Sequence, residues 1–312
     1  MSTLTPCLPA RPLRPRPFER LRGAAAASGL PLLFILLWSS GYVAGKVALP
    51  HAGPLTLLTL RFGLAAAVLL AVALATGAPW PRRRADWGHL AVVGLLMQVL
   101  HFSGIYFALR WGLSAGVAGL LIGLMPLATA LGAHLWLAER LGGRQWLGLL
   151  GGLAGVALVI ADKPLGGGAW AAHAVAGLGL LGLVAGTLYQ KRFCARMDLR
   201  SGAGIQMAVS ALAVALVAGP SERFAIDWAP ELVGAWLWLG LVNSIAAFSL
   251  MFVMIRRGQA GQVARLFFLV PGVSALLGFV LLGERLTPLA LAGFALSALA
   301  VCVAESVAAA KR

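Results

Sequence analysis

The stretch AERLGGRQWLG at residues 138–148 returns as GERLTPLALAG at residues 283–293, an offset of 145 positions. The same spacing runs through much of the chain, and it slips by one residue only before each proline, where Gly112 maps to Gly258. A single offset held over this length indicates two copies of one unit. Further pairs at this spacing are Gly41 and Gly186, Lys46 and Lys191, Pro126 and Pro271, and the similar amides Gln98 and Asn243.

The composition is typical of a membrane protein. Of the 312 residues, 60% are hydrophobic and 11% are charged, and the mean hydropathy is +0.90. Soluble domains carry about 25% charged residues. The three cysteines, Cys7, Cys194 and Cys302, lack the spacing of a disulfide framework or of a metal site. We therefore expect no metal ion and no cofactor.

Ten apolar stretches of about 20 residues each are long enough to cross ~30 Å of hydrocarbon. They predict an all-α membrane protein with ten transmembrane helices in two inverted five-helix repeats, residues 30–162 and 163–308. Residues 1–29 are rich in proline and arginine, which predicts a disordered cytoplasmic segment before an uncleaved first span. The predicted spans are 30–49, 54–76, 88–109, 113–137, 145–161, 171–190, 203–217, 232–255, 259–282 and 288–308.

The net charge of +15 at first suggests a nucleic-acid partner. However, with the amino terminus placed in the cytoplasm, 18 of the 25 basic residues face the cytoplasm and 5 face outside, while Arg61 and Arg265 lie inside helices. This asymmetry follows the positive-inside rule. It predicts a multi-pass protein of the bacterial inner membrane with both termini cytoplasmic, and it removes the case for nucleic acid.

An odd number of helices in each repeat turns the second copy over relative to the first. The charges agree, because Lys46 is predicted outside and its mate Lys191 inside. Inverted repeats place a shared cavity near the membrane midplane, and rocking one half against the other opens this cavity to alternate sides.

With these features, the chain resembles the drug/metabolite transporter superfamily, in particular its ten-helix exporters with two EamA-type repeats. The resemblance runs from Trp38 to about Val303. It rests on the proline of each half, the Glu-Arg-Leu helix exit and the glycine in the next helix, with Trp38-Ser39-Ser40 and Arg61-Phe62 also similar to the family. It implies export of amino acids, other metabolites or toxic organic compounds, and it identifies the fold better than the substrate.

Two prolines and two glutamates mark the ends of this repeated signal. Pro126 and Pro271 remove backbone hydrogen bonds inside membrane helices and are expected to bend them, either as structural kinks or as a hinge or gate. Glu139 and Glu284 lie at helix ends beside arginines, and we interpret them as helix caps or ion-pair partners.

Two arginines lie about two turns inside membrane helices, where a lipid-facing guanidinium costs at least ~2.5 kcal/mol. Arg61 is near the outer part of its helix, and we interpret it as a structural residue that snorkels to the interface. Arg265, followed by Phe268 and Pro271, is the better candidate for a substrate carboxylate, with a gate or a helix-to-helix pairing as the alternative.

Several polar and aromatic residues fall on common helical faces. Gln98, His101, Phe102 and Ile105 share one face; they line a midplane cavity or bond neighbouring helices at ~1 kcal/mol or less each. His101 is a candidate proton carrier or a packing residue, and Trp38 and Tyr42 either stack on a substrate or fill the bundle. The predicted substrate-binding set is Trp38, Tyr42, Gln98, His101, Phe102, Asn243, Arg265 and Phe268.

No aspartate or glutamate lies in the middle of a predicted span, whereas related small multidrug antiporters use a glutamate there. This favours neutral, zwitterionic or anionic cargo. Nucleotide-binding and catalytic motifs are lacking, so no enzyme is expected, and no charged ring or filter sequence supports a channel. We predict a transporter that exports amino acids or similar small metabolites as a monomer or homodimer, with a multidrug or toxic-compound efflux protein as the alternative.

Overall fold

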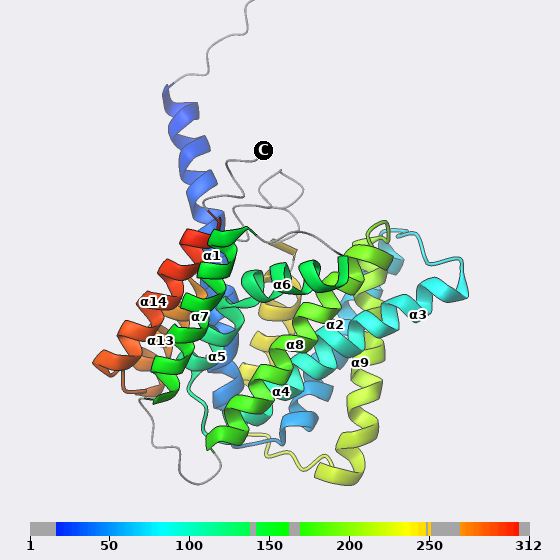
Figure 1. Cartoon of the computed structure of the whole chain (residues 1–312). Coiled ribbons are helices and arrows are strands. Elements are labelled where there is room, and N and C mark those ends of the chain that lie inside the picture. The colour runs from blue at the N-terminus through cyan, green and yellow to red at the C-terminus, as the bar shows by residue number, and fades with distance from the viewer. Residues whose placement is uncertain (1–16, 138–141, 162–168, 248, 251–268, 306–312) are drawn as a thin grey trace, which may run out of the picture.

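The computed structural model describes residues 17–137, 142–161, 169–247, 249–250 and 269–305 (Figure 1). The regular structure of these residues is helical, apart from one isolated β-bridge between Ala52 and Ile226. Six of the helical segments are long and apolar enough to cross a membrane. The predicted spans 232–255 and 259–282 run into residues outside the described part, so the count of ten stays a prediction.

The helices follow the predicted order along the chain. The span Arg84–Arg110 is one membrane segment made of α3, η1 and α4, and α10 continues into η2 in the same way. The bounds are α1 Pro17–Ala48, α2 Pro54–Ala75, α3 Arg84–Val93, η1 Gly94–Leu100, α4 His101–Arg110, α5 Ala115–Gly123, α6 Met125–Leu137, α7 Gly143–Ala161, α8 Ala169–Phe193, α9 Leu199–Glu222, α10 Pro230–Leu237, η2 Trp238–Ala247, α13 Val270–Leu282 and α14 Pro288–Glu305.

The two π-helical segments occupy equivalent places in the repeats. Shifting η1 by 145 residues gives 239–245, which lies wholly inside η2. A π-helix closes its hydrogen bonds from residue i to i+5, so it widens a helix locally and is frequent at functional sites. The irregular middle of this span is therefore a property of both repeats.

Repeat mates pack against each other. The most extensive helix contacts join α2 to α9 and α7 to α14, and each pair is related by the 145-residue offset. The α2 and α9 helices run antiparallel: Leu55, at the start of α2, donates its N–H to Glu222 at the end of α9, while Arg200, at the start of α9, donates to Thr76 just after α2. Figure 1 shows α7 beside α14 and α2 beside α9.

Small residues set the distance between α7 and α14. A Cβ on Gly155 would lie 2.6 Å from the carbonyl oxygen of Gly293, and a Cβ on Gly293 would lie 2.6 Å from that of Gly155. Both distances are shorter than real Cβ contacts, so the two backbones touch at a place that only glycine permits. Close backbone approach of this kind is how helices gain dispersion contacts in lipid.

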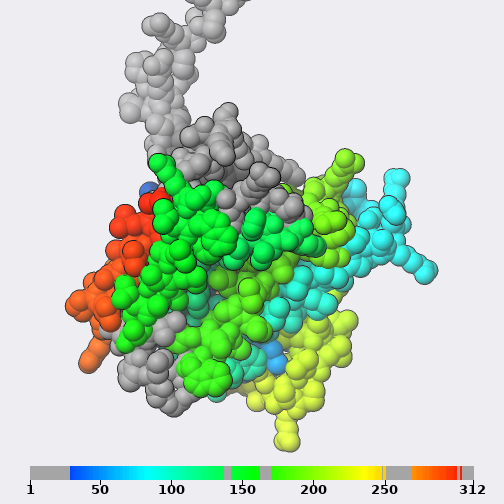
Figure 2. Space-filling model, in the orientation of Figure 1, coloured from blue at the N-terminus to red at the C-terminus, as the bar shows by residue number. Residues whose placement is uncertain are grey.

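The outer faces of the bundle are apolar. Leu147 and Leu150 of α7 and Leu181 of α8 are 62%, 61% and 63% exposed. Figure 2 shows these two helices in green across the middle of the visible face. An exposed surface of this kind is stable against lipid tails and not against water.

The proline that recurs in each repeat lies at the start of a helix and not inside one. In the first repeat, α5 ends at Gly123, the backbone turns at Leu124, and Pro126 lies in the first turn of α6. Pro271 lies in the first turn of α13. Proline is tolerated there because the first turn has no intrahelical acceptor for its missing N–H. The expected bend of the first repeat is thus a break between two helices, and a hinge or gate role for both prolines stays a prediction.

Candidate functional site

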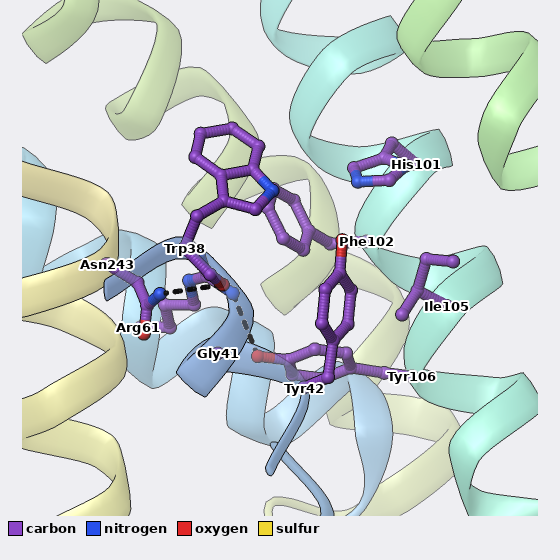
Figure 3. Close-up of a pocket in the computed structure, with 9 residues that line it drawn as sticks. All are labelled: Trp38, Gly41, Tyr42, Arg61, His101, Phe102, Ile105, Tyr106 and Asn243. Carbon is purple, nitrogen blue, oxygen red and sulfur yellow. Dashed lines mark hydrogen bonds between the residues drawn. The ribbon is translucent and has the colours of Figure 1, made fainter. Parts of the chain in front are cut away.

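A cavity of about 20 Å³ lies at the centre of the bundle, between the first repeat and the η2 segment of the second. This volume holds roughly one water molecule. Figure 3 shows the lining side chains converging from α1, α2, α4 and η2. They are Trp38, Gly41, Tyr42, Arg61, His101, Phe102, Ile105, Tyr106 and Asn243.

One face of α1 forms the first wall. Trp38, Gly41 and Tyr42 are spaced three and four residues apart, which places them on the same side of a helix. The side chains of Trp38 and Tyr42 both line the cavity (Figure 3). Gly41 leaves room for the amide of Asn243, because a Cβ there would lie 2.8 Å from Asn243 Nδ2.

Asn243 joins the second repeat to this wall. Its Nδ2 donates to the carbonyl oxygen of Leu37 at 2.6 Å, which fixes the orientation of the amide because a carbonyl only accepts. Its Oδ1 is buried with no hydrogen-bond partner among the described residues. The predicted meeting of Trp38, Tyr42 and Asn243 is therefore present in the structure.

Arg61 of α2 places a cation in the cavity. It is 3% exposed, its Nε donates to Ser244 Oγ at 3.0 Å, and its Nη1 donates to the Tyr106 hydroxyl at 2.8 Å. The guanidinium carbon also lies 4.1 Å from the centroid of the Phe102 ring, a cation–π distance. All of these partners are neutral, and no ion pair of Arg61 is found among the described residues.

The remaining side of the cavity is formed by residues of α4. Phe102 and Tyr106 are one turn apart, and their ring centroids are 6.2 Å apart in an edge-to-face arrangement. His101 Nδ1 lies 3.1 Å from the carbonyl oxygen of Gly179. Since that oxygen only accepts, Nδ1 carries the proton and Nε2 of the neutral ring is the acceptor. The His101 side chain therefore links α4 to α8 through this hydrogen bond, and it also lines the cavity.

The structure brings together five of the eight predicted binding residues: Trp38, Tyr42, His101, Phe102 and Asn243. Gln98 is buried but does not line the cavity. It lies in η1, whereas the cavity-lining residues of this span begin with His101 at the start of α4. Arg265 and Phe268 lie outside the described residues.

The interpretation of Arg61 as a snorkelling residue is wrong. Its guanidinium is enclosed by Ser244, Phe102 and Tyr106 and does not reach the interface. Sequence reasoning also missed Tyr106, although it follows Phe102 by one turn on the predicted cavity face. The useful signal was that spacing, together with the cost of leaving a buried arginine without polar partners.

A second polar cluster closes one end of the bundle. Lys46, at the end of α1, pairs with Glu284 at 2.6 Å, and Glu284 also accepts from the N–H of Ala115 at the start of α5 at 2.9 Å. The structure confirms Glu284 as both a helix cap and an ion-pair partner. We call Lys46, Glu284 and Ala115 the latch. Glu139, the repeat mate of Glu284, lies outside the described residues.

Further contacts join other helices at the same end. Glu222 accepts from the N–H groups of Leu55 at 3.0 Å and Thr56 at 2.7 Å, which caps the start of α2. His51 lies 2.8 Å from Asp227, and Arg110 donates to the carbonyl oxygen of Leu49. The Arg110 bond lies within the first repeat, whereas the contacts of Glu222, Asp227 and Glu284 join the two repeats and close this end of the described bundle.

The chain matches the model of the EamA-like transporter family twice, at residues 27–161 and 170–305. A solved crystal structure, 23% identical, superposes with a TM-score of 0.65 and covers 91% of this chain and 98% of its own, so the fold is shared.

Curated relatives are similar over most of their length. A Salmonella typhimurium protein named "probable amino-acid metabolite efflux pump" is 28% identical over 279 residues, 85% of this chain and 89% of its own. A Streptantibioticus cattleyicolor protein named "probable terminal-alkyne amino-acid exporter" is 28% identical over 280 residues, 85% and 88%. The uncharacterized transporter YvbV of Bacillus subtilis is 25% identical over 277 residues, 87% and 89%.

Proposed function

The chain belongs to the EamA-like transporter family, and from this premise we propose that it exports amino acids or similar small metabolites across the inner membrane. The observation that carries the proposal is the chemistry of the cavity. It holds the buried cation Arg61 among aromatic walls, and the described residues that line it include no aspartate or glutamate. Such a cavity suits cargo with a negative group and an apolar side chain.

The names of the two relatives that mention amino acids support the same substrate class. The cavity chemistry also disfavours organic cations, since Arg61 would repel them and no described lining residue offers a counter-charge. Amino-acid export is therefore preferred to multidrug efflux.

We further propose ten spans in two inverted repeats, with both termini in the cytoplasm and the latch on the outer side. The antiparallel packing of α2 with α9 supports the inversion, and the basic residues support the orientation. In this arrangement the structure corresponds to a state closed to the outside. Export by alternating access then requires the latch to break while the cargo remains bound at the cavity.

Transport into proteoliposomes tests the function. Purified protein is reconstituted, and uptake of a panel of radiolabelled amino acids is compared with that of ethidium and tetraphenylphosphonium. Saturable amino-acid transport above that of empty vesicles is the expected result. Transport of the two cations without any amino acid would instead establish the drug-efflux alternative.

A further inference from the structure

Arg61 is a buried cation whose hydrogen-bonding capacity is largely unused. A guanidinium has five N–H donors, and the structure engages one at Nε with Ser244 and one at Nη1 with Tyr106. Nη2 has no hydrogen-bond partner among the described residues. An arginine in the middle of a membrane protein with only neutral partners is costly, so the site favours an anion, which the described residues that line the cavity do not supply.

The surroundings of Arg61 hold the guanidinium in one orientation. Ser244 accepts from one edge, Tyr106 accepts from another, and the ring of Phe102 covers one face at 4.1 Å. Arginine held in this way loses little side-chain entropy when it binds a planar anion. A carboxylate matches the fork of the guanidinium with two parallel hydrogen bonds.

Three apolar or aromatic side chains line the cavity beside this cation. Trp38, Phe102 and Ile105 line the cavity together with Arg61 (Figure 3). A ligand that satisfies both features has a carboxylate at one end and an apolar group at the other. The present volume of about 20 Å³ is too small for such a molecule, so the walls must separate when it enters.

We propose that Arg61 is the carboxylate anchor of the transport cavity and that the cargo is a monocarboxylate with an apolar or aromatic side chain. Tyr106 and Ser244 are positioning residues for this anchor. The inference rests on the proposed function and deepens it, because it assigns substrate selectivity to one side chain.

The test uses four probes of similar size that differ in charge: L-phenylalanine, L-phenylalaninamide, phenethylamine and 3-phenylpropanoate. In the reconstituted wild type, phenylalanine uptake should be inhibited by 3-phenylpropanoate and not by phenethylamine or by the amide. Arg61→Gln should lower phenylalanine uptake at least tenfold and abolish the difference between the acid and the amide. Arg61→Lys should recover part of the uptake, because the charge remains and the fork is lost.

The matched control is Arg84→Gln, which removes the same charge from an exposed position and should leave uptake and inhibition unchanged. Binding is measured separately as the rise in melting temperature that 3-phenylpropanoate causes in the detergent-purified protein. Wild type should be stabilised and Arg61→Gln should not, which reports on recognition without transport.

Inhibition by 3-phenylpropanoate that persists at wild-type strength in Arg61→Gln would overturn the anchor, while amino-acid transport by the wild type left the proposed function standing. If Arg61→Gln does not fold, the inhibition pattern of the wild type decides: inhibition by phenethylamine as strong as by 3-phenylpropanoate overturns the anchor. If no amino acid and no carboxylate binds or is transported, the proposed function and the anchor both fail.

Discussion

Asn243 is the residue at which the second repeat enters the cavity. Its amide donates to the carbonyl oxygen of Leu37 at 2.6 Å and lies directly over Gly41. Asn243→Leu keeps the branched shape of the side chain but removes this hydrogen bond and presses two larger methyl groups against α1. We expect uptake in proteoliposomes to fall about tenfold, the effect of roughly 1.4 kcal/mol, with normal membrane insertion.

Gln98 offers the matched comparison for Asn243. It is the repeat mate, it is also buried, and its Oε1 has no hydrogen-bond partner among the described residues. Replacing an unsatisfied buried polar group by an apolar one is nearly neutral or stabilising. Gln98→Leu should therefore change uptake by less than about threefold, because a single hydrogen bond between helices in lipid contributes only about 0.6 kcal/mol on average. A loss as large as that of Asn243→Leu would mean that the cavity extends to η1.

At the scale of helices, the latch ties α1, α5 and α13 together at one end. Glu284→Gln keeps an acceptor for the N–H of Ala115 but removes the charge that pairs with Lys46. Because the Lys46 and Glu284 side chains are 25% and 11% exposed, the pair is only partly screened, and we expect a contribution of about 1 kcal/mol. The end closed by the latch should open roughly fivefold more often.

Opening at the latch is measured with a cysteine in place of buried Leu113, just before α5. In a background without native cysteines, a membrane-impermeant maleimide should label this position faster in Glu284→Gln. The matched control is Glu231→Gln, which changes an exposed glutamate at the start of α10. Equal labelling rates in the two variants would show that the pair does not hold this end closed.

A second prediction at this scale concerns the contact of α7 with α14. Gly155→Val places side-chain atoms against the carbonyl oxygen of Gly293, which is 2.6 Å from the position of a Cβ and cannot yield. The melting temperature should drop and less folded protein should be recovered. Gly177→Val is the control, since no heavy atom lies within 4 Å of the added Cβ. A similar loss in both would point to valine in a helix, and not to the contact, as the cause.

At the scale of the whole molecule, the basic residues predict which side each end faces. Cysteines at the exposed positions of Arg83 and Arg196 should be labelled only from the cytoplasm, and one at Ala225 only from outside. The native cysteines are first replaced by serine. Burial and the nearby Asp86 raise the pKa of the Cys194 thiol, so this residue reacts slowly in any case. Labelling of Arg83→Cys from outside intact cells would refute the inverted arrangement.

Much of the architecture was predictable because it depends on local patterns of the sequence. Hydropathy marks the spans, and the 145-residue offset pairs α2 with α9 and α7 with α14, which are the helices that pack most closely. Helical spacing grouped His101 and Phe102 with Ile105, and Trp38 with Tyr42, on the faces that line the cavity. Each of these conclusions needs only the periodicity of a helix and the thickness of a bilayer.

The sequence by itself therefore determined the membrane class, the two repeats and most of the aromatic wall. The direction in which Arg61 points was decided only by the tertiary structure, because helical period does not tell which face of a span meets the bundle. The same holds for Gln98, which is buried but does not line the cavity. It holds also for the latch, whose partners Lys46 and Glu284 are 238 residues apart. Contacts between distant helices depend on how whole faces pack, and no local pattern encodes that.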